Sequence, residues 1–326
     1  MIRVSSAVIC ILLSLCFDGG KAICVDKNAL YNVNATVHLT LHGSGLKVLN
    51  VNFYTLERYV TIDVTQANVT DLCEGIIKNF MNLDSLSLIN VNLSRIEPEA
   101  FQKVPKLRKL SLAVNKLTEI VKGSFNNLEA LEFLYLSANE ISTIEENAFG
   151  SLINLRKIHL DRNKIVGLNG NLFHGCARLS LINLKFNMIE SITKASFQDL
   201  RPNHQSSITI QLNKNRIRDV DPSTFGMSNP VILHLEGNYL DATSDLLYGL
   251  KEYSKLYLDG NQVRCLADDV IENMRNTTKD LSLLNNPMDC DCMDRIDERL
   301  DEVYGTGKLE YSSTFPCLFA QEIKFG

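Results

Sequence analysis

Apolar residues recur along this chain with a period near 24 residues, and polar residues recur between them in the same phase. The clearest unit reads Leu-x-x-Leu-x-Leu-x-x-Asn-x-Leu and is formed by Leu107, Leu110, Leu112, Asn115 and Leu117. Residues 131–141 and 155–165 repeat the pattern, with Ile at some Leu positions. A fixed period of this length predicts stacked repeats, each built as one small structural unit.

The Asn position marks one point in every repeat. Eight of its eleven occurrences hold Asn, and the steps between them run from 23 to 28 residues. The longest step contains the polar, proline-containing segment 201–207, which predicts a loop. The eleven positions are Ser44, Ala67, Val91, Asn115, Asn139, Asn163, Asn187, Asn215, Asn238, Asn261 and Asn286.

Alternation inside each unit, as in Leu110-Ser111-Leu112, predicts a short strand with one face inward. One unit cannot bury that face alone, but stacked neighbours can form a continuous core. The Asn amide can satisfy backbone groups buried where the chain turns. Ala67 and Val91 cannot supply that hydrogen bond, so we expect the first three turns to be less regular.

A phenylalanine follows the Asn position at repeat spacing. These rings could form a ligand-binding stripe, but we interpret them as a stacked spine that fills the side opposite the strands. They are Phe101, Phe125, Phe149, Phe173, Phe197 and Phe225.

With these motifs, the chain resembles the extracellular leucine-rich repeat family over about residues 36 to 290. The resemblance implies an α/β solenoid: a horseshoe with a parallel sheet on its concave face and an irregular or short-helical convex side. We expect an N-terminal cap and first repeat in 23–50, repeats in 51–286, and a cysteine-containing C-terminal cap in 287–326.

Residues 1–22 have the features of a secretory signal peptide. Arg3 is followed by an apolar stretch over 8–17 and by small residues up to Ala22, after which we expect cleavage. The apolar run is too short to span a bilayer, so we expect a secreted protein without a transmembrane anchor. The net charge of −5 and the dispersed lysines argue against nucleic acid as a partner.

Seven cysteines follow this segment, and in a secreted chain they predict disulfides. The segment 286–292 resembles the start of the family's cysteine-rich cap. Cys265 follows Asn261 by the same four residues that separate Cys290 from Asn286. We therefore expect the pairs Cys265–Cys290, Cys292–Cys317 and Cys24–Cys73.

Cys176 is then left over. It is either a buried structural thiol or a bridge to a second chain in a disulfide-linked dimer.

Four Asn-x-Ser/Thr sequons predict glycosylation at Asn34, Asn68, Asn92 and Asn276. Three of them lie in the first turns, so glycans there would leave the middle and later turns for binding.

The sequence contains no persuasive catalytic or metal-binding motif. The glycines adjacent to Ser44 have the wrong spacing for a nucleophile elbow, and Cys290 and Cys292 are too close for a zinc pair. We expect neither an enzyme nor a cofactor.

The outward residues of the strands form the best candidate site, because solenoids offer such rows for recognition. Aromatic, charged and amide side chains gather in the middle and later turns, a composition typical of protein-binding surfaces. The candidate binding residues are Phe133, Tyr135, Lys157, His159, Asp161, Asn183, Lys185, Gln211, His234, Glu236, Tyr257 and Asp259.

The leading hypothesis is a secreted, non-enzymatic protein that binds an extracellular protein or glycan-bearing surface through its concave face. Among the roles that the family resemblance implies, we favour recognition in innate immunity. The alternative is a structural or adhesion subunit of a disulfide-linked extracellular complex.

Overall fold

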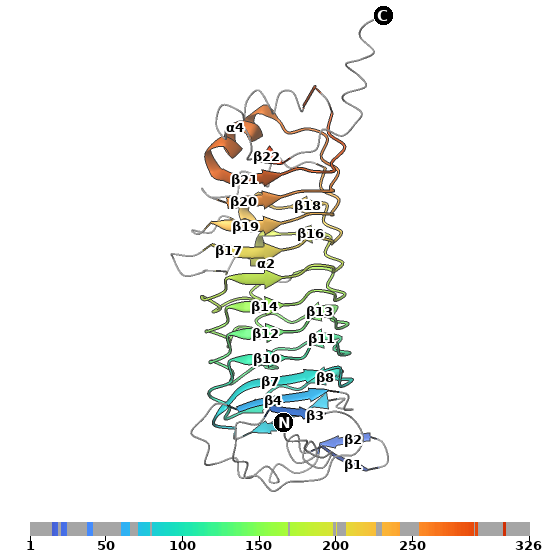
Figure 1. Cartoon of the computed structure of the whole chain (residues 1–326), viewed down its shortest axis with the longest axis vertical. Coiled ribbons are helices and arrows are strands. Elements are labelled where there is room, and N and C mark those ends of the chain that lie inside the picture. Colours follow the sequence, from blue (N-terminus) through green and yellow to red (C-terminus); the bar gives the residue numbers. More distant parts are fainter. Residues whose placement is uncertain are drawn as a thin grey trace, which may run out of the picture. The chain divides into compact units, whose positions relative to one another are not determined.

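The computed structural model describes residues 15–18, 21–24, 38–41, 60–65, 71–78, 80–168, 170–197, 200, 207–225, 230–241, 254–289, 291–292 and 309–310. The chain divides into two compact units. Unit 1 comprises residues 1–165 and 169–179, and unit 2 comprises 166–168 and 180–326. Each unit is a solenoid of stacked turns with a parallel sheet along one side, which confirms the expected fold class (Figure 1).

The long sheet of unit 1 receives one strand from each turn. In order its strands are β3 (His38–Leu41), β4 (Val60–Thr65), β7 (Leu83–Ile89), β10 (Lys109–Ser111), β12 (Phe133–Tyr135) and β14 (Lys157–His159). The register follows the sequence repeat, since Leu110 pairs with Leu134 and Leu134 with Ile158.

Two-residue parallel strands line the other side of unit 1. They are β5 (Asp71–Leu72) with β8 (Arg95–Ile96), β6 (Ile77–Lys78) with β9 (Phe101–Gln102), and β11 (Glu119–Ile120) with β13 (Thr143–Ile144). Near the N-terminus, β1 (Leu15–Asp18) pairs antiparallel with β2 (Lys21–Cys24), and the predicted cleavage point after Ala22 lies within β2.

Unit 2 has the same construction. Its long sheet contains β15 (Leu181–Asn183), β17 (Ile208–Gln211), β19 (Val231–His234), β20 (Ser254–Tyr257), β21 (Thr278–Ser282) and β22 (Leu309–Glu310). The last strand lies in the expected cap and was not predicted. It pairs with β21, so the parallel sheet continues beyond the final repeat.

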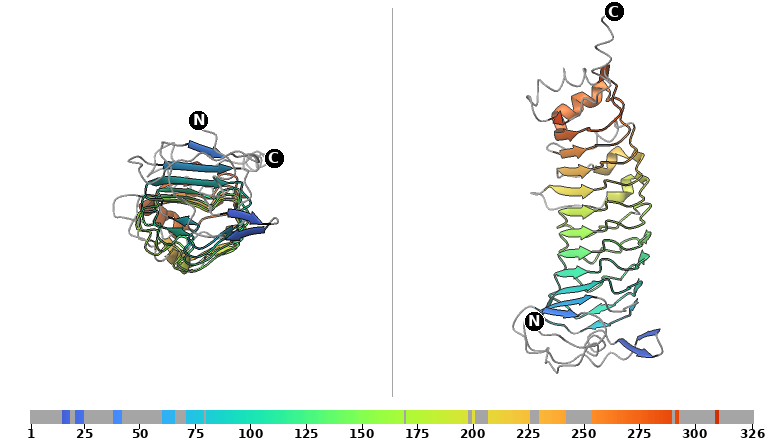
Figure 2. Two further views of the ribbon diagram at one scale, coloured as in Figure 1. Left: turned by 90° about the horizontal axis from the view of Figure 1, so that it is seen from below. Right: turned by 45° about the vertical axis from the view of Figure 1, so that its right-hand side comes forward.

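The side of unit 2 away from this sheet is partly helical. It holds the paired strands β16 (Ser191–Ile192) and β18 (Asp219–Val220), the short helix α2 (Lys194–Phe197) and the 3-10 turn η2 (Pro222–Phe225) (Figure 2). Helix α4 (Asp268–Thr277) follows Cys265 and was not expected. Its first turn carries Asp268 and Asp269, which favour a helix N-terminus electrostatically.

The repeat leucines and isoleucines form the core. Leu110, Leu134, Ile158 and Leu184 are all 0% exposed, as the stacked-turn hypothesis requires. The phenylalanine spine is also buried. The ring centroids of Phe125 and Phe149 lie 5.9 Å apart, and those of Phe197 and Phe225 lie 5.8 Å apart. The interpretation of this column as packing is therefore confirmed.

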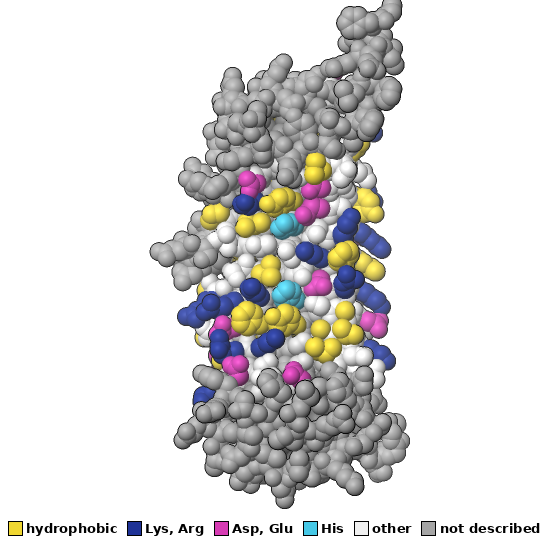
Figure 3. All heavy atoms as spheres, viewed as in Figure 1, with side chains coloured by type: hydrophobic (Ala, Val, Ile, Leu, Met, Phe, Trp, Pro, Cys, Tyr) yellow, Lys and Arg dark blue, Asp and Glu magenta, His cyan; other side chains and the backbone are white. Residues whose placement is uncertain are grey.

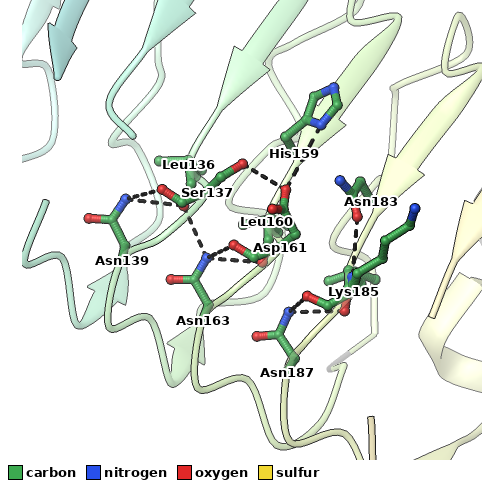
Figure 4. Close-up of polar contacts among 11 residues, drawn as sticks. Leu136, Ser137, Asn139, His159, Leu160, Asp161, Asn163, Asn183, Lys185 and Asn187 are labelled. Carbon is green, nitrogen blue, oxygen red and sulfur yellow. Dashed lines mark hydrogen bonds and ion pairs between the residues drawn. The ribbon is translucent and has the colours of Figure 1, made fainter. Parts of the chain in front are cut away.

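The buried asparagines join each turn to the one before it. Asn139 Oδ1 accepts a hydrogen bond from Leu117 N at 3.1 Å, and Asn139 Nδ2 donates to Leu112 O at 2.9 Å, both in the preceding turn. The same Nδ2 donates to Leu136 O of its own turn at 3.1 Å (Figure 4). Asn115 and Asn163 repeat this pattern in unit 1, and Asn215, Asn238, Asn261 and Asn286 repeat it in unit 2.

The early turns differ where the Asn is replaced. Val91 is buried, and its own N–H donates to Asn115 Oδ1 in the next turn at 3.0 Å. The strands before Ala67 and Val91 are longer than those of later turns: β4 has six residues and β7 has seven, with a register shift at Val60. In these early turns, the strands thus pair directly at backbone positions that are bonded by an Asn amide in the later turns. The expected irregularity is confirmed for β4 and β7, while Ser44 and Ala67 lie outside the described residues.

In the turns that the structure describes, the residue before the Asn position adopts a left-handed backbone conformation. In unit 1 the φ values are 55° at Asn90, 57° at Val114, 54° at Ala138 and 57° at Arg162. In unit 2, Gly237 and Gly260 occupy the equivalent position. A β-branched residue is rare in this conformation, so Val114 is a site of backbone strain. Its side chain is 49% exposed and contributes little burial in return.

One predicted disulfide is wrong. Cys265 pairs with Cys292, with a Cα–Cα distance of 5.5 Å, and not with Cys290. Pro287 follows the Asn286 position and has no N–H to continue the backbone pairing that the equivalent residue makes in earlier turns, such as Gln262 N to Leu240 O. The chain instead turns helically, with Cys292 N donating to Asp289 O, and this brings the Cys292 side chain inward.

The pair Cys292–Cys317 is therefore also wrong. Cys290 and Cys317 lie outside the described residues. Cys73 is disulfide-bonded, as expected, but the side chain of its expected partner Cys24 lies outside the described residues.

Replacing Asn139 with Ala tests the bridge between turns. The substitution leaves Leu117 N buried without its acceptor and removes one of the two donors to Leu112 O, which keeps its bond from Asn115 Nδ2. We therefore expect the free energy of unfolding to fall by about 3 kcal/mol. Asn154→Ala is the control, since Asn154 Nδ2 makes one exposed bond to Glu129 O, and should cost no more than about 0.5 kcal/mol. Equal losses in denaturant titrations of the two variants would contradict the bridging role.

Replacing Val114 with Asn tests the backbone strain. Asn tolerates the left-handed conformation, so the variant should gain about 1 kcal/mol of unfolding free energy. Val166 is a matched control because it is 51% exposed but does not have a positive φ. Thermal unfolding should show a gain for Val114→Asn and none for Val166→Asn. A gain in both variants would mean that replacing an exposed apolar side chain, and not relief of backbone strain, stabilises the protein.

Candidate interaction surface

The outward residues of the strands form one row in each unit, as predicted from the repeat. In unit 1 the register runs from Thr40 through Asp63, Ser87, Ser111 and Tyr135 to His159. In unit 2 it runs from Asn183 through Gln211, His234 and Tyr257 to Ser282. We call the solvent side of each long sheet its sheet face.

The sheet face of unit 1 carries a stacked aromatic pair. The rings of Tyr135 and His159 lie 4.9 Å apart between centroids and are nearly parallel, at 14°. Lys109 Nζ lies 5.6 Å from the Tyr135 ring centroid, within range of a cation–π interaction. His159 Nδ1 is 4.0 Å from Asp161 Oδ1, and Asp161 Oδ1 accepts from Ser137 Oγ at 2.7 Å (Figure 4).

A second stacked pair lies on the sheet face of unit 2. His234 and Tyr257 have ring centroids 4.6 Å apart at an angle of 11°. His234 Nδ1 lies 2.9 Å from Glu236 Oε1. Asp259 Oδ1 accepts from Leu284 N at 2.7 Å, so the backbone holds this carboxylate. In the space-filling view a histidine lies beside hydrophobic or tyrosine side chains at both places (Figure 3).

The remaining candidates differ in exposure. Phe133, Lys185 and Gln211 are half-buried, and Lys157 is exposed. Asn183 is only 9% exposed, and its Oδ1 accepts from Lys185 N at 3.2 Å. It therefore offers far less surface to a partner than its outward position suggests.

Sequence reasoning missed an ion-pair ladder at the start of the unit 1 strands. Arg108 Nε lies 2.8 Å from Glu132 Oε1, and Arg156 Nε lies 3.2 Å from Glu132 Oε2. The hydrogen bond from Arg108, with the positive charges around it, lowers the pKa of the Glu132 carboxyl. The signal was present in the sequence, because Arg108, Glu132 and Arg156 are each 24 residues apart. Exposed pairs of this kind contribute little stability individually.

Of the four sequons, the structure describes the side chain of one. Asn92 is exposed, as a glycosylation site requires. Asn276 lies in helix α4, and Asn34 and Asn68 fall outside the described residues.

Cys176 is buried, with 1% of its surface exposed, and its Sγ donates to Phe149 O at 3.3 Å. Burial raises the pKa of this thiol to about 12. The position supports the structural-thiol alternative, because a second chain has no access to the sulfur in the folded unit.

The described part of the chain holds no group of three or more His, Cys, Asp or Glu side chains placed to bind a metal ion. None of the helices in the described ranges is long and apolar enough to cross a membrane.

A profile of the family "Leucine rich repeat" matches residues 60–117, 105–165 and 153–202. Residues 60–202 belong to the leucine-rich repeat family, in agreement with their repeats and asparagine bridges. No curated protein matches the sequence.

Two solved structures are similar in fold. The crystal structure of a TLR13–ssRNA13 complex has 18% sequence identity and a TM-score of 0.51, and the match covers 84% of this chain and 46% of that one. For the leucine-rich repeat domain of APL1B the identity is 22%, the TM-score 0.49, and the coverage 64% and 59%. The match thus spans about half the length of these structures, and at this identity it shows the fold alone.

Chemical modification tests the assignment of Cys176. A pKa near 12 and burial leave almost no accessible thiolate, so iodoacetamide should not label Cys176 in the native protein and should label it in denaturant. Peptide mass spectrometry reads out the site. Rapid labelling of Cys176 in the native protein would instead support a disulfide bridge to a second chain. So would a dimer that reducing agents dissociate and that Cys176→Ser abolishes.

Proposed function

We propose that this protein is a secreted, non-enzymatic recognition protein that binds an extracellular protein through the sheet faces of its repeats. The observation that carries the proposal is the stacked Tyr–His pair on each sheet face. Each pair is half-buried on a rigid parallel sheet and surrounded by charged groups. Aromatic side chains held in place before binding lose little conformational entropy when a partner docks.

Secretion is supported by the features of residues 1–22, by the disulfide between Cys265 and Cys292, and by the exposed sequon at Asn92. Within the family to which residues 60–202 belong, recognition in immunity is the role we favour. That choice is an analogy, because one fold serves many functions. The mechanism needs no chemical turnover, only complementary shape and charge over the sheet face.

Two double variants test the binding surface unit by unit. They are Tyr135→Ala with His159→Ala in unit 1, and His234→Ala with Tyr257→Ala in unit 2. Partners would be identified by cross-linking in the native extracellular fluid, purified, and measured by surface plasmon resonance. Losing an aromatic hot spot costs about 2 kcal/mol or more, so at least one variant should raise Kd by about 30-fold.

The control variant replaces Glu119 and Thr143, which are exposed on the paired strands β11 and β13 away from the long sheet. Its Kd should match that of the wild type. Wild-type affinity in both sheet-face variants, with unchanged circular dichroism, would remove the proposed surface. A loss of affinity in the control variant alone would also remove the proposed surface.

A further inference from the structure

The two stacked pairs share a three-part arrangement. In each, a tyrosine ring stacks on the histidine of a neighbouring strand, and a carboxylate follows that histidine by two residues. Unit 1 has Tyr135, His159 and Asp161, and unit 2 has Tyr257, His234 and Glu236. The two arrangements differ in the neighbouring groups that contact the tyrosine ring and the carboxylate.

In unit 1, the tyrosine ring and the carboxylate both have partners within the protein. Lys109, on the strand before Tyr135, places its ammonium 5.6 Å from the tyrosine ring centroid. Ser137 Oγ donates to Asp161 Oδ1 at 2.7 Å. A cation and a hydrogen-bond donor therefore already occupy the positions that this arrangement offers.

Unit 2 lacks both of these groups at the corresponding positions. The residue that matches Lys109 in register is Ile232 on β19, which is apolar. Lys255, on the same strand as Tyr257, is engaged by Asp280, and the hydrogen bond between them raises the pKa of the lysine. The local lysine is thus already paired with a carboxylate.

The carboxylate of unit 2 is also only half satisfied. Glu236 Oε1 contacts His234 Nδ1, but Oε2 is buried without a hydrogen-bond partner among the described residues. Asn213 follows Gln211, the register partner of His234, by two residues, and its Oδ1 is also buried without a hydrogen-bond partner among the described residues. Buried acceptors left unpaired are costly, so a donor that reaches them gains more than an ordinary surface hydrogen bond.

We propose that this place on unit 2, the surface formed by His234, Tyr257, Glu236 and Asn213, binds an arginine side chain of a protein partner. The inference rests on the proposed function and names the chemistry of that partner. A guanidinium is planar and cationic, so it stacks on the aromatic rings while its N–H groups donate to Glu236 Oε2 and Asn213 Oδ1. Asp259, at the next register position, adds a second negative charge.

Access requires a movement of side chains, since both acceptor atoms are buried in the free protein. The Glu236 side chain keeps 25% of its surface exposed. Its last torsion is soft, so the carboxylate can turn its unpaired oxygen toward an incoming donor. The rings need no movement, because stacking already holds them in place.

The test uses three short peptides, acetyl-Gly-Arg-Gly-amide and its citrulline and lysine counterparts, titrated against the full protein. Citrulline keeps the shape of arginine but has no charge. Selective carbon-13 labels on His and Tyr rings report binding by NMR. The arginine peptide should shift His234 and Tyr257 saturably, and the citrulline peptide should bind about tenfold more weakly or worse. The lysine peptide should bind less tightly than arginine, since it cannot stack as a plane.

Glu236→Gln removes the charge with little change of shape and should weaken arginine binding about tenfold. Glu119→Gln is the matched control, because Glu119 is exposed on β11 away from the long sheet, and it should leave the peptide affinity unchanged. Equal binding of the arginine and citrulline peptides, equal binding of arginine and lysine, an unaffected Glu236→Gln variant, or no shift at all would each overturn the proposal.

Failure here and failure of the proposed function give different results. If no arginine peptide binds but the His234 and Tyr257 double variant still loses its protein partner, the surface recognises another chemistry and the arginine proposal is wrong. If the peptide binds as expected while the double variant keeps the partner, the arginine site stands and the proposed docking surface fails.

Discussion

The amide of one buried asparagine in each turn is the contact on which the solenoid depends. Its oxygen accepts from a backbone N–H of the preceding turn, and its nitrogen donates to carbonyls of both turns. A turn without this amide would leave that buried N–H unpaired, at a cost of about 1–3 kcal/mol, while each carbonyl would keep the bond from the neighbouring asparagine. Burial of the leucines stabilises the stack but does not fix how one turn is aligned on the next. The hydrogen bonds of the amide are directional, so they fix where each strand ends and how the next turn is aligned with it. Where valine replaces asparagine, the early strands extend instead and pair directly.

This alignment places like residues next to one another along each unit. On the sheet face the register brings tyrosine against histidine, and on the opposite side it brings phenylalanine against phenylalanine. The two columns follow the same geometric rule but have different consequences. The phenylalanines are sealed inside and contribute packing. The tyrosines and histidines are half-buried, so part of each ring reaches solvent in a fixed position before any partner arrives.

Local differences decide what each aromatic pair can do. In unit 1 a lysine and a serine of the protein complete the arrangement, whereas in unit 2 an apolar residue stands where the lysine would be, and one carboxylate oxygen lacks a donor. The repeat alone would make the two places equivalent. Side chains on the flanking strands make them different, so specificity lies in departures from the repeat pattern.

The sequence by itself determined the architecture, because a periodic pattern repeats the same packing problem and the same solution in every turn. Strand positions, the phenylalanine spine, the buried asparagines and the outward row followed from spacing alone. The tertiary structure decided what depends on local breaks in that period. Pro287 cannot donate a backbone hydrogen bond, so the chain turned and joined Cys265 to Cys292, and a backbone bond drew Asn183 inward. Which carboxylate kept an unpaired oxygen also required three-dimensional contacts, since it depended on residues about 24 positions away in the chain.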